Sequence, residues 1–359
     1  MGYVNKDIPH WKEGKMSQKK ELTEEYLAER FPELWAYVSP KETTDVDFNC
    51  GNLWLTTTKN KTTMVYDEKI TEEYMRNVAA TIALVTCKEF NQFQNILCCD
   101  TDTLRVTCVH QDTSSGNISV CLRKEIPELR YTMQEAIDEG FCDEQTFRLL
   151  VNCVDAGCFN FTFCGTPGTG KTELLKNLSS FISKHKKVIT IEDVSEIHYQ
   201  KINPDHNCIE LKVGKMTYQD LINFSLRMNA EVILFGESIG KNAKYLLECW
   251  ANGVTTMSTL HVQDARSIPD KIVNALGIRQ DNERIINQLH NDVGIAILVK
   301  KKEKDGVLKR YIDQICFYYR KDGINGQAMV VEDGVLYPKY LPAHIKKKIE
   351  DEIERDAFS

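Results

Sequence analysis

The sequence predicts an α/β protein: a domain built on a mostly parallel sheet, preceded by a smaller α+β domain. Three observations support this class. Strand and helix patterns alternate in the second half of the chain, short alternating strands surround one helix in the first half, and a glycine-rich loop joins a strand to a helix near the middle. The length of 359 residues fits two domains, each able to bury its own core.

The first domain is expected over residues 17–126, after a polar and loosely structured stretch at 1–16. Short runs that alternate apolar and polar residues are typical of half-buried strands, and apolar residues at helical spacing indicate amphipathic helices. On this basis we expect helices at 17–38 and 71–86, strands within 46–57 and at 62–66, and strands at 103–110 and 118–124 joined by a turn at 113–117.

The second domain is expected over residues 127–359. Thr217 and Asp220 have the spacing of a capping box at the start of one of its helices. Its expected helices are 132–139, 143–155, 173–185, 216–229, 240–253 and 342–356, its strands are 158–164, 186–193, 231–237 and 254–261, and hairpins with Asp-Gly turns follow residue 293. Such alternation predicts helices on both faces of the sheet and ligands beyond the carboxyl ends of its strands.

The most informative segment is GTPGTGKT at residues 165–172, which matches the phosphate-binding pattern G-x-x-x-x-G-K-[ST] in the required strand–loop–helix context. Glycines let backbone N–H groups wrap a triphosphate, and the helix N-terminus adds partial positive charge. The nucleotide-binding residues predicted here are Gly165, Thr166, Pro167, Gly168, Thr169, Gly170, Lys171, Thr172 and Glu173. Lys171 is expected to reach the β- and γ-phosphates, and Thr172 to ligate Mg²⁺.

Composition excludes several other classes of protein. The net charge of −7 and the absence of a strongly basic stretch argue against nucleic acid as the main ligand. The longest apolar runs are much shorter than a membrane span, the N-terminus lacks a secretory signal, and Lys6 stands where a myristoylation signal needs Ser or Thr. The 13 cysteines include no C-x-x-C pair, so we expect neither a zinc site nor a disulfide framework, and we expect a cytoplasmic protein.

Four motifs in a fixed order, GTPGTGKTELLKNL, VITIEDVSEI, LRMNAEVILFGESIG and TTMSTLH, resemble the type II/type IV secretion ATPase superfamily. The branch that powers conjugation-type secretion and Tad/Flp pilus assembly is the most similar. The resemblance implies a RecA-like P-loop domain, a hexameric ring, and ATP with Mg²⁺ held between the two domains. It also implies partners in the inner membrane and a location at the inner face of that membrane.

The resemblance assigns roles to acidic and histidine residues at the ends of the expected strands. Glu237 follows the apolar run EVILF as a Walker B acid that polarises the attacking water and helps to hold Mg²⁺. Glu192 and Asp193 match an acidic motif that contacts Mg²⁺ and the water, with Glu196 a weaker candidate. His261 matches the position that senses the γ-phosphate. The alternative for each residue is an ordinary polar residue at a strand end.

Three arginines complete the site that the resemblance implies. Arg105 and Arg123, on adjacent expected strands of the first domain, match arginines that close over the nucleotide, and Arg227 matches an arginine before the Walker B strand. Guanidinium groups suit bidentate contacts with phosphate oxygens. The alternative for each arginine is a surface residue without a ligand.

The chain also departs from the family pattern. Ile239 stands where the family has arginine after the Walker B acid, Ala230-Glu231 replaces a proline-aspartate pair, and Asn252-Gly253 replaces a glycine-histidine pair. The tetracysteine zinc insertion of type II members is missing. These differences leave Lys171 and Glu237 in place, so hydrolysis is still expected, but they argue against the usual coupling between subunits.

The sequence therefore predicts an ATPase motor for pilus assembly, secretion or conjugation. A second hypothesis is an ATP-gated assembly scaffold whose hydrolysis is impaired by the change at residue 239. A P-loop kinase is disfavoured because no arginine-rich lid stretch follows Glu237, and a DNA translocase is disfavoured by the acidic net charge.

Overall fold

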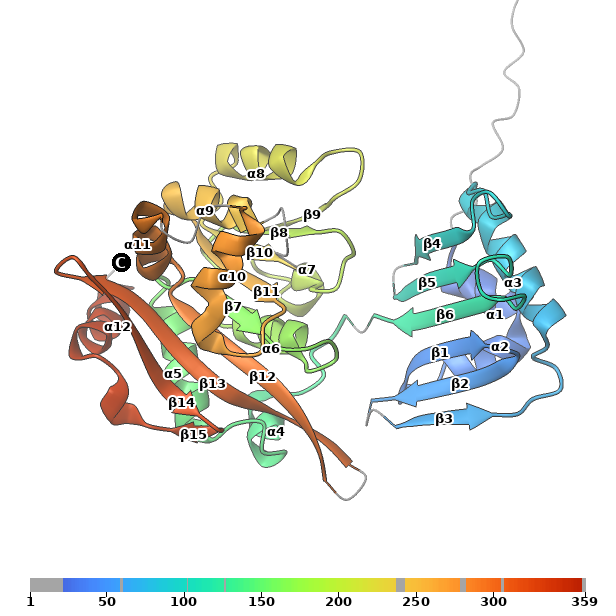
Figure 1. Cartoon of the computed structure of the whole chain (residues 1–359), viewed down its shortest axis with the longest axis horizontal. Coiled ribbons are helices and arrows are strands. Elements are labelled where there is room, and N and C mark those ends of the chain that lie inside the picture. Colours follow the sequence, from blue (N-terminus) through green and yellow to red (C-terminus); the bar gives the residue numbers. More distant parts are fainter. Residues whose placement is uncertain are drawn as a thin grey trace, which may run out of the picture. The chain divides into compact units, whose positions relative to one another are not determined.

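The computed structural model describes residues 22–58, 61–101, 103–125, 127–236, 243–277, 282–304 and 307–356. The chain divides into two compact units, Met1–Glu125 (unit 1) and Ile126–Ser359 (unit 2), and each unit is described by itself (Figure 1).

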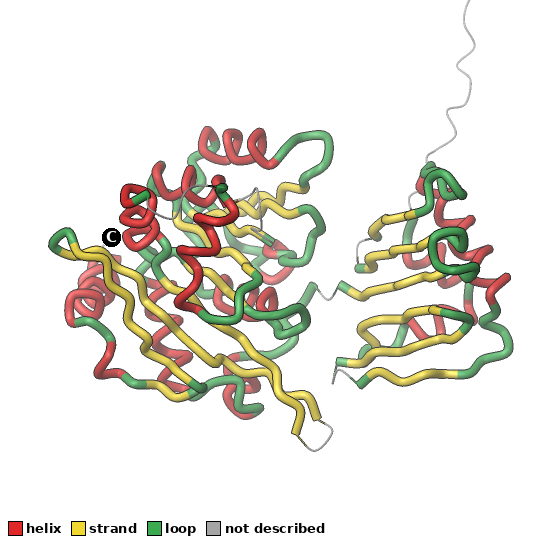
Figure 2. The backbone as a smooth tube through the Cα atoms, viewed as in Figure 1, coloured by secondary structure: helices red, strands yellow, loops and turns green. Residues whose placement is uncertain are grey.

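Unit 1 is a six-stranded antiparallel sheet with helices against one face (Figures 1 and 2). Alternation along the strands explains the two faces, since Val46 and Phe48 are buried under the helices while Asp45 and Asp47 point the other way. In the order β3-β2-β1-β6-β5-β4, its strands are β1 (Thr43–Asn49), β2 (Asn52–Thr57), β3 (Thr62–Val65), β4 (Ile96–Asp100), β5 (Leu104–Val109) and β6 (Ser119–Lys124), and its helices are α1 (Glu24–Arg30), α2 (Pro32–Val38) and α3 (Glu72–Thr86).

The helix expected over 17–38 is wrong as a single element. Two helices replace it, and the break lies at Phe31, whose backbone is non-helical with φ −132° and ψ 61°. Pro32 causes the break because its ring disfavours a helical conformation in the residue before it, whereas a proline at the first position of a new helix costs nothing. Residues 17–21 of the expected helix lie outside the described residues.

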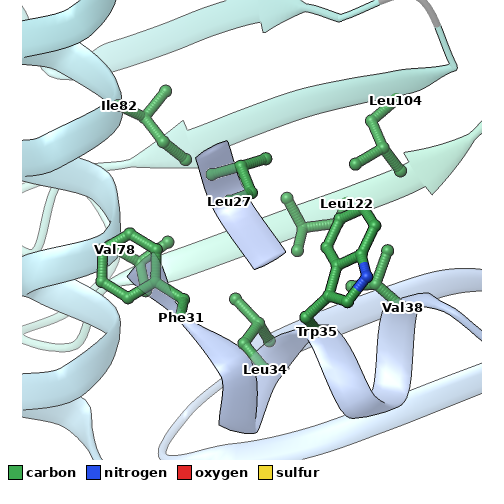
Figure 3. A pocket seen from close by; sticks show the side chains of 9 residues that line it. All are labelled: Leu27, Phe31, Leu34, Trp35, Val38, Val78, Ile82, Leu104 and Leu122. Carbon is green, nitrogen blue, oxygen red and sulfur yellow. The ribbon is translucent and has the colours of Figure 1, made fainter. Parts of the chain in front are cut away.

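The remaining elements expected in unit 1 are confirmed, including the helix that begins after Thr71 and the strands that became β5 and β6. Strand β4 was not predicted. A small apolar cavity lies between the helices and the sheet of unit 1, and its volume of about 10 Å³ is hardly enough for one water molecule (Figure 3). Its lining residues are Leu27, Phe31, Leu34, Trp35, Val38, Val78, Ile82, Leu104 and Leu122.

Unit 2 contains a nine-stranded sheet in the order β15-β14-β13-β12-β7-β11-β10-β8-β9 (Figure 1). The six strands from β12 to β9 run parallel, and β13, β14 and β15 extend the sheet as antiparallel hairpins. The strands are β7 (Phe161–Cys164), β8 (Val188–Glu192), β9 (Cys208–Lys212), β10 (Val232–Phe235), β11 (Thr255–Leu260), β12 (Ile295–Lys304), β13 (Val307–Lys321), β14 (Ile324–Glu332) and β15 (Val335–Leu336).

Helices cover both faces of this sheet, as the alternation predicted, and each face has its own apolar cluster. One cluster includes Leu174 and Phe161, and the other includes Leu246 and Ile233. The helices are α4 (Met133–Asp138), α5 (Glu144–Asp155), α6 (Lys171–Ser179), α7 (Tyr199–Ile202), α8 (Tyr218–Arg227), α9 (Ala243–Ala251), α10 (Ile268–Ala275), α11 (Glu283–Asp292) and α12 (Ala343–Asp356), with 3₁₀ turns at Ala265–Ser267 and Pro338–Tyr340.

Several local predictions in unit 2 are confirmed. Thr217 and Asp220 form the reciprocal hydrogen bonds of a capping box at α8. Asp333 and Gly334 both have positive φ in the turn between β14 and β15, whereas the expected Asp305-Gly306 turn lies outside the described residues. Four elements were not predicted: α7, β9, α10 and α11.

Among the described residues, we find no helix with the length and hydrophobicity that crossing a membrane requires.

Candidate nucleotide-binding site

The loop at residues 165–170 joins the buried strand β7 to helix α6, which begins at Lys171. Three of its glycines have positive φ: +142° at Gly165, +74° at Gly168 and +94° at Gly170. A Cβ atom at Gly165 would also lie 2.3 Å from the carbonyl oxygen of Val299 on β12. Glycine is therefore required at Gly165 both for backbone conformation and for space.

Lys171 lies at the start of α6 with only 8% of its surface exposed. Its Nζ donates to the carbonyl oxygen of Thr166 at 3.2 Å, and the same oxygen accepts a hydrogen bond from the Thr169 hydroxyl at 2.9 Å. These contacts hold the lysine across the loop, where a phosphate would meet both the ammonium group and the helix N-terminus.

His261 follows β11, and its ring lies beside the loop. Its Nδ1 is 3.4 Å from Nζ of Lys171 and 3.1 Å from the carbonyl oxygen of Gly165. This nitrogen accepts from the lysine in one tautomer and donates to Gly165 in the other. The structure thus brings the histidine and the lysine together, although they are far apart in the sequence.

Glu192 ends strand β8 and is only 3% exposed. Burial raises the pKa of its carboxyl group to about 8, although the backbone N–H groups of Glu196 and Ile197 donate to Oε1 at 3.0 and 3.1 Å and oppose that rise. Asp193, the next residue, is exposed and accepts a hydrogen bond from the Tyr218 hydroxyl at 3.2 Å.

Oxygen ligands suited to Mg²⁺ lie around the first turn of α6. The hydroxyl of Thr172 is 3.4 Å from Oε2 of Glu196, and the Glu192 carboxyl group hydrogen-bonds to the backbone N–H of that same glutamate. Hydroxyl and carboxylate oxygens are the ligands that Mg²⁺ prefers, so Thr172 and Glu196 have the chemistry that the ion needs, although the described residues contain no cluster of three or more acidic, histidine or cysteine side chains that could hold a metal. Sequence reasoning gave Glu196 less weight than the structure now gives it.

Glu237 and Ile239 lie outside the described residues. The strand before them, β10, lies between β8 and β11. The residue that follows this strand, Gly236, packs tightly against Glu192, because a Cβ atom there would lie 3.0 Å from Oε1 of that residue, and the Glu192 side chain would have to shift.

Glu173, in the first turn of α6, is held by two cations. Arg130 Nε lies 3.2 Å from its Oε1, and the fully buried Lys176 lies 3.7 Å from the same oxygen. Lys176 also donates to the carbonyl oxygen of Glu128 at 3.2 Å. These contacts tie the P-loop helix to the segment that enters unit 2.

Arg105 and Arg123 occupy opposite positions on β5 and β6 of unit 1. Arg105 pairs with Glu125 at 3.3 Å, and Arg123 pairs with Asp45 at 2.6 Å. Their approach to a nucleotide remains a prediction.

Arg227 is exposed at the last turn of α8, just before β10 begins. Strands β10, β11 and β7 run parallel. The residues before β10 therefore lie at the amino ends of these strands, whereas the P-loop lies at their carboxyl ends. The structure does not bring Arg227 to the P-loop of its own chain.

Sequence reasoning missed two cations that contact the P-loop. Lys301 donates to the carbonyl oxygen of Pro167 at 3.3 Å, and Arg310 donates through Nε to that of Gly168 at 3.0 Å. Both come from the β12–β13 hairpin, where they belong to the charged run KKKEKDGVLKR that matches no motif.

A mostly parallel sheet with helices on both faces and a glycine loop between β7 and α6 define a P-loop α/β domain of the RecA-like class. The chain belongs to the family described as "Type II/IV secretion system protein", whose model matches residues 102–337, more than half of the chain.

Relatives agree with this family. The chain is 29% identical over 262 residues to an uncharacterised protein of Bacillus anthracis, covering 72% of this chain and 59% of that protein. It is 33% identical over 176 residues to VirB11 of Agrobacterium fabrum (45% and 50% covered) and 27% identical over 132 residues to the competence protein ComGA of Streptococcus pneumoniae (36% and 40%). The chain thus spans 40–59% of the length of these relatives.

Solved structures show the same fold. The ATPase DotB of Yersinia pseudotuberculosis has a TM-score of 0.61 at 13% identity, with 99% of this chain and 91% of that chain covered. The pilus retraction motor PilT, solved with ADP, has a TM-score of 0.55 at 16% identity, with 94% and 89% covered.

Proposed function

We propose that this protein is a cytoplasmic ATPase motor that hydrolyses Mg-ATP to power pilus assembly, type II/IV-type secretion or conjugation. One observation carries the proposal. The P-loop lysine, His261 and the acidic group of Glu192 and Glu196 all lie around the carboxyl ends of β7, β11 and β8, where ligands of parallel sheets bind.

The residues divide the chemistry among them. Backbone N–H groups of the loop and the ammonium group of Lys171 bind the phosphates, and Thr172 with Glu196 and Glu192 would hold Mg²⁺. When bound, the ion supplies positive charge that offsets the charge of the phosphate oxygens. Glu237 orients the attacking water, and His261 contacts the γ-phosphate side of the loop.

The proposed assembly is a homohexameric ring that docks on inner-membrane components of a secretion or pilus machine. Arg105 and Arg123 would close over the nucleotide within a subunit. Arg227 lies near the amino ends of the parallel strands, away from its own P-loop, so it would act at the site of a neighbouring subunit.

Phosphate release by the purified chain with Mg-ATP tests hydrolysis, with Lys171→Ala as the matched control. Light scattering at several concentrations, with and without a non-hydrolysable ATP analogue, tests the ring. We expect turnover by the wild-type chain and a nucleotide-promoted hexamer. ATP binding and assembly without turnover would instead favour the alternative hypothesis, an ATP-gated assembly scaffold whose hydrolysis is impaired by Ile239. A strict monomer with undiminished turnover would contradict the motor.

A further inference from the structure

The β12–β13 hairpin places two cations on the outer side of the P-loop. Lys301 and Arg310 stand directly opposite each other on the two strands. Their side chains donate to the carbonyl oxygens of consecutive loop residues, Pro167 at 3.3 Å and Gly168 at 3.0 Å. Hydrogen bonds from charged donors are stronger than neutral ones, so this pair restrains two adjacent peptide planes of the loop.

The orientation of those peptide planes matters for a phosphate. In a trans peptide, the carbonyl oxygen and the N–H of the next residue point in opposite directions. With the carbonyl oxygens of Pro167 and Gly168 turned toward the hairpin, the N–H groups of Gly168 and Thr169 point away from it. Phosphate-binding loops need such N–H groups to converge on the ligand.

The hairpin packs closely against the loop. A Cβ atom at Gly170 would lie 3.3 Å from Cδ of Arg310, and one at Gly168 would lie 3.5 Å from Nζ of Lys301. Arg310 is half-buried, and this burial, together with the nearby Arg130, lowers the pKa of its guanidinium group. Partial burial of a guanidinium group removes part of its hydration, which costs free energy. Arg310 therefore has a role other than keeping the surface soluble.

We propose that Lys301 and Arg310 are positioning residues that hold the P-loop with its N–H groups turned toward a nucleotide polyphosphate. They would act from the outer side of the loop and without touching the reacting atoms. This inference rests on the proposed function, because it takes the loop to bind a nucleotide.

The same hairpin supplies a matched control. Lys302 and Lys309 form the next opposed pair, and because neighbouring residues of a strand point to opposite faces, they lie on the other side of the hairpin. Both are exposed, and Lys302 lies over the ring of Tyr311 at 4.6 Å. The double variant Lys302→Gln/Lys309→Gln removes the same charge from the same strands but leaves the loop contacts in place.

The test compares the wild-type chain, Lys301→Gln/Arg310→Gln and the control pair by calorimetric titration with Mg-ADP, inorganic pyrophosphate and adenosine. Loss of the two contacts should raise the Kd for Mg-ADP and pyrophosphate about tenfold or more. Adenosine binding should not change, because the effect is confined to the phosphates. Arg310→Lys should recover part of the affinity, and KM for ATP should rise more than kcat falls.

Equal affinities in the two double variants would overturn the inference, as would an equal loss of adenosine binding. Unliganded melting temperatures separate these results from misfolding. If the double variant unfolds, the two single variants Lys301→Gln and Lys302→Gln give the same comparison, with Lys302→Gln as the control. A wild-type chain that binds Mg-ADP without hydrolysing ATP would defeat the proposed motor but leave this comparison valid, whereas a chain that binds no nucleotide would end both.

Discussion

Nζ of Lys171 lies 3.4 Å from Nδ1 of His261, so the P-loop lysine and the residue after β11 contact each other directly. The same imidazole nitrogen lies 3.1 Å from the carbonyl oxygen of Gly165 at the start of the loop. A bound γ-phosphate would compete with His261 for the ammonium group. The histidine would then change its hydrogen-bond partner whenever the terminal phosphate arrives or leaves.

Replacing Lys171 with alanine should abolish measurable nucleotide binding. The variant loses a charged donor to the phosphates while the loop glycines remain, and we expect the Kd for Mg-ATP to rise about a hundredfold or more. Fluorescence titration with a labelled ATP analogue checks this. Near-normal affinity would contradict the assigned role of the lysine.

Glu237→Gln should bind ATP normally and hydrolyse it very slowly. The amide keeps the shape of the side chain but cannot polarise the attacking water, so kcat should fall about a hundredfold or more while binding persists. Single-turnover phosphate release separates the two steps. Wild-type turnover would move the role to another carboxylate, with Glu192 the first candidate.

Gly165→Ala should destabilise unit 2 much more than Gly253→Ala. Both positions have positive φ, but a methyl group at Gly165 would meet the Val299 carbonyl, whereas nothing lies within 4 Å of one at Gly253. We expect losses in the free energy of unfolding of more than about 3 kcal/mol and of about 1 kcal/mol, respectively. Urea unfolding measures both, and similar losses would show that the loop can move away from β12.

The stability of unit 2 should depend on pH through Glu192. The folded-state pKa of about 8 exceeds the ordinary value of 4.5, so the folded chain keeps a proton that the unfolded chain has lost. By linkage, this contribution is fully present below pH 4.5 and disappears as the pH rises through 8. Urea unfolding between pH 5 and 8, without Mg²⁺ or nucleotide, should show a steeper decline for wild type than for Glu192→Gln. The exposed Glu350→Gln serves as control, and parallel curves for all three would contradict the assignment.

Arg105→Ala and Arg123→Ala should each lower kcat strongly if unit 1 completes the active site. Loss of an arginine finger in related chemistry costs about 10³–10⁵ in rate. Arg76→Ala is the control, because Arg76 forms an exposed i,i+4 pair with Glu72 on α3. Removal of residues 1–125 should have a similar effect on hydrolysis, and a fully active fragment would rule out a catalytic role for unit 1.

Short sequence patterns predicted the helices and strands whose formation depends on residues close together in the chain. Helices α3 and α8 have threonine N-caps, and the buried strands β8, β10 and β11 are rich in β-branched or apolar residues. By contrast, β9 is a half-buried edge strand of five residues, and its alternation is too short to distinguish it from a loop.

The candidate site divides in the same way. The P-loop residues are contiguous and carry their own signature, so a motif could find them. The contacts of Arg310 with Gly168 and of Glu196 with Thr172 depend on how distant segments meet. The sequence alone does not show that Arg310 contacts the loop while its neighbour Lys309 is exposed.

Both strands that flank β7 come much later in the sequence, which matters for folding during synthesis. Strand β7 lies between β11 and β12, both of which leave the ribosome long after it. Until residues 295–298 of β12 are available, the four buried residues Phe161–Cys164 have no partner strand on that side. Such an unpaired edge is a template for wrong strand pairing. During synthesis the P-loop would therefore gain its packing against β12, at the carbonyl oxygen of Val299, only after that strand has left the ribosome.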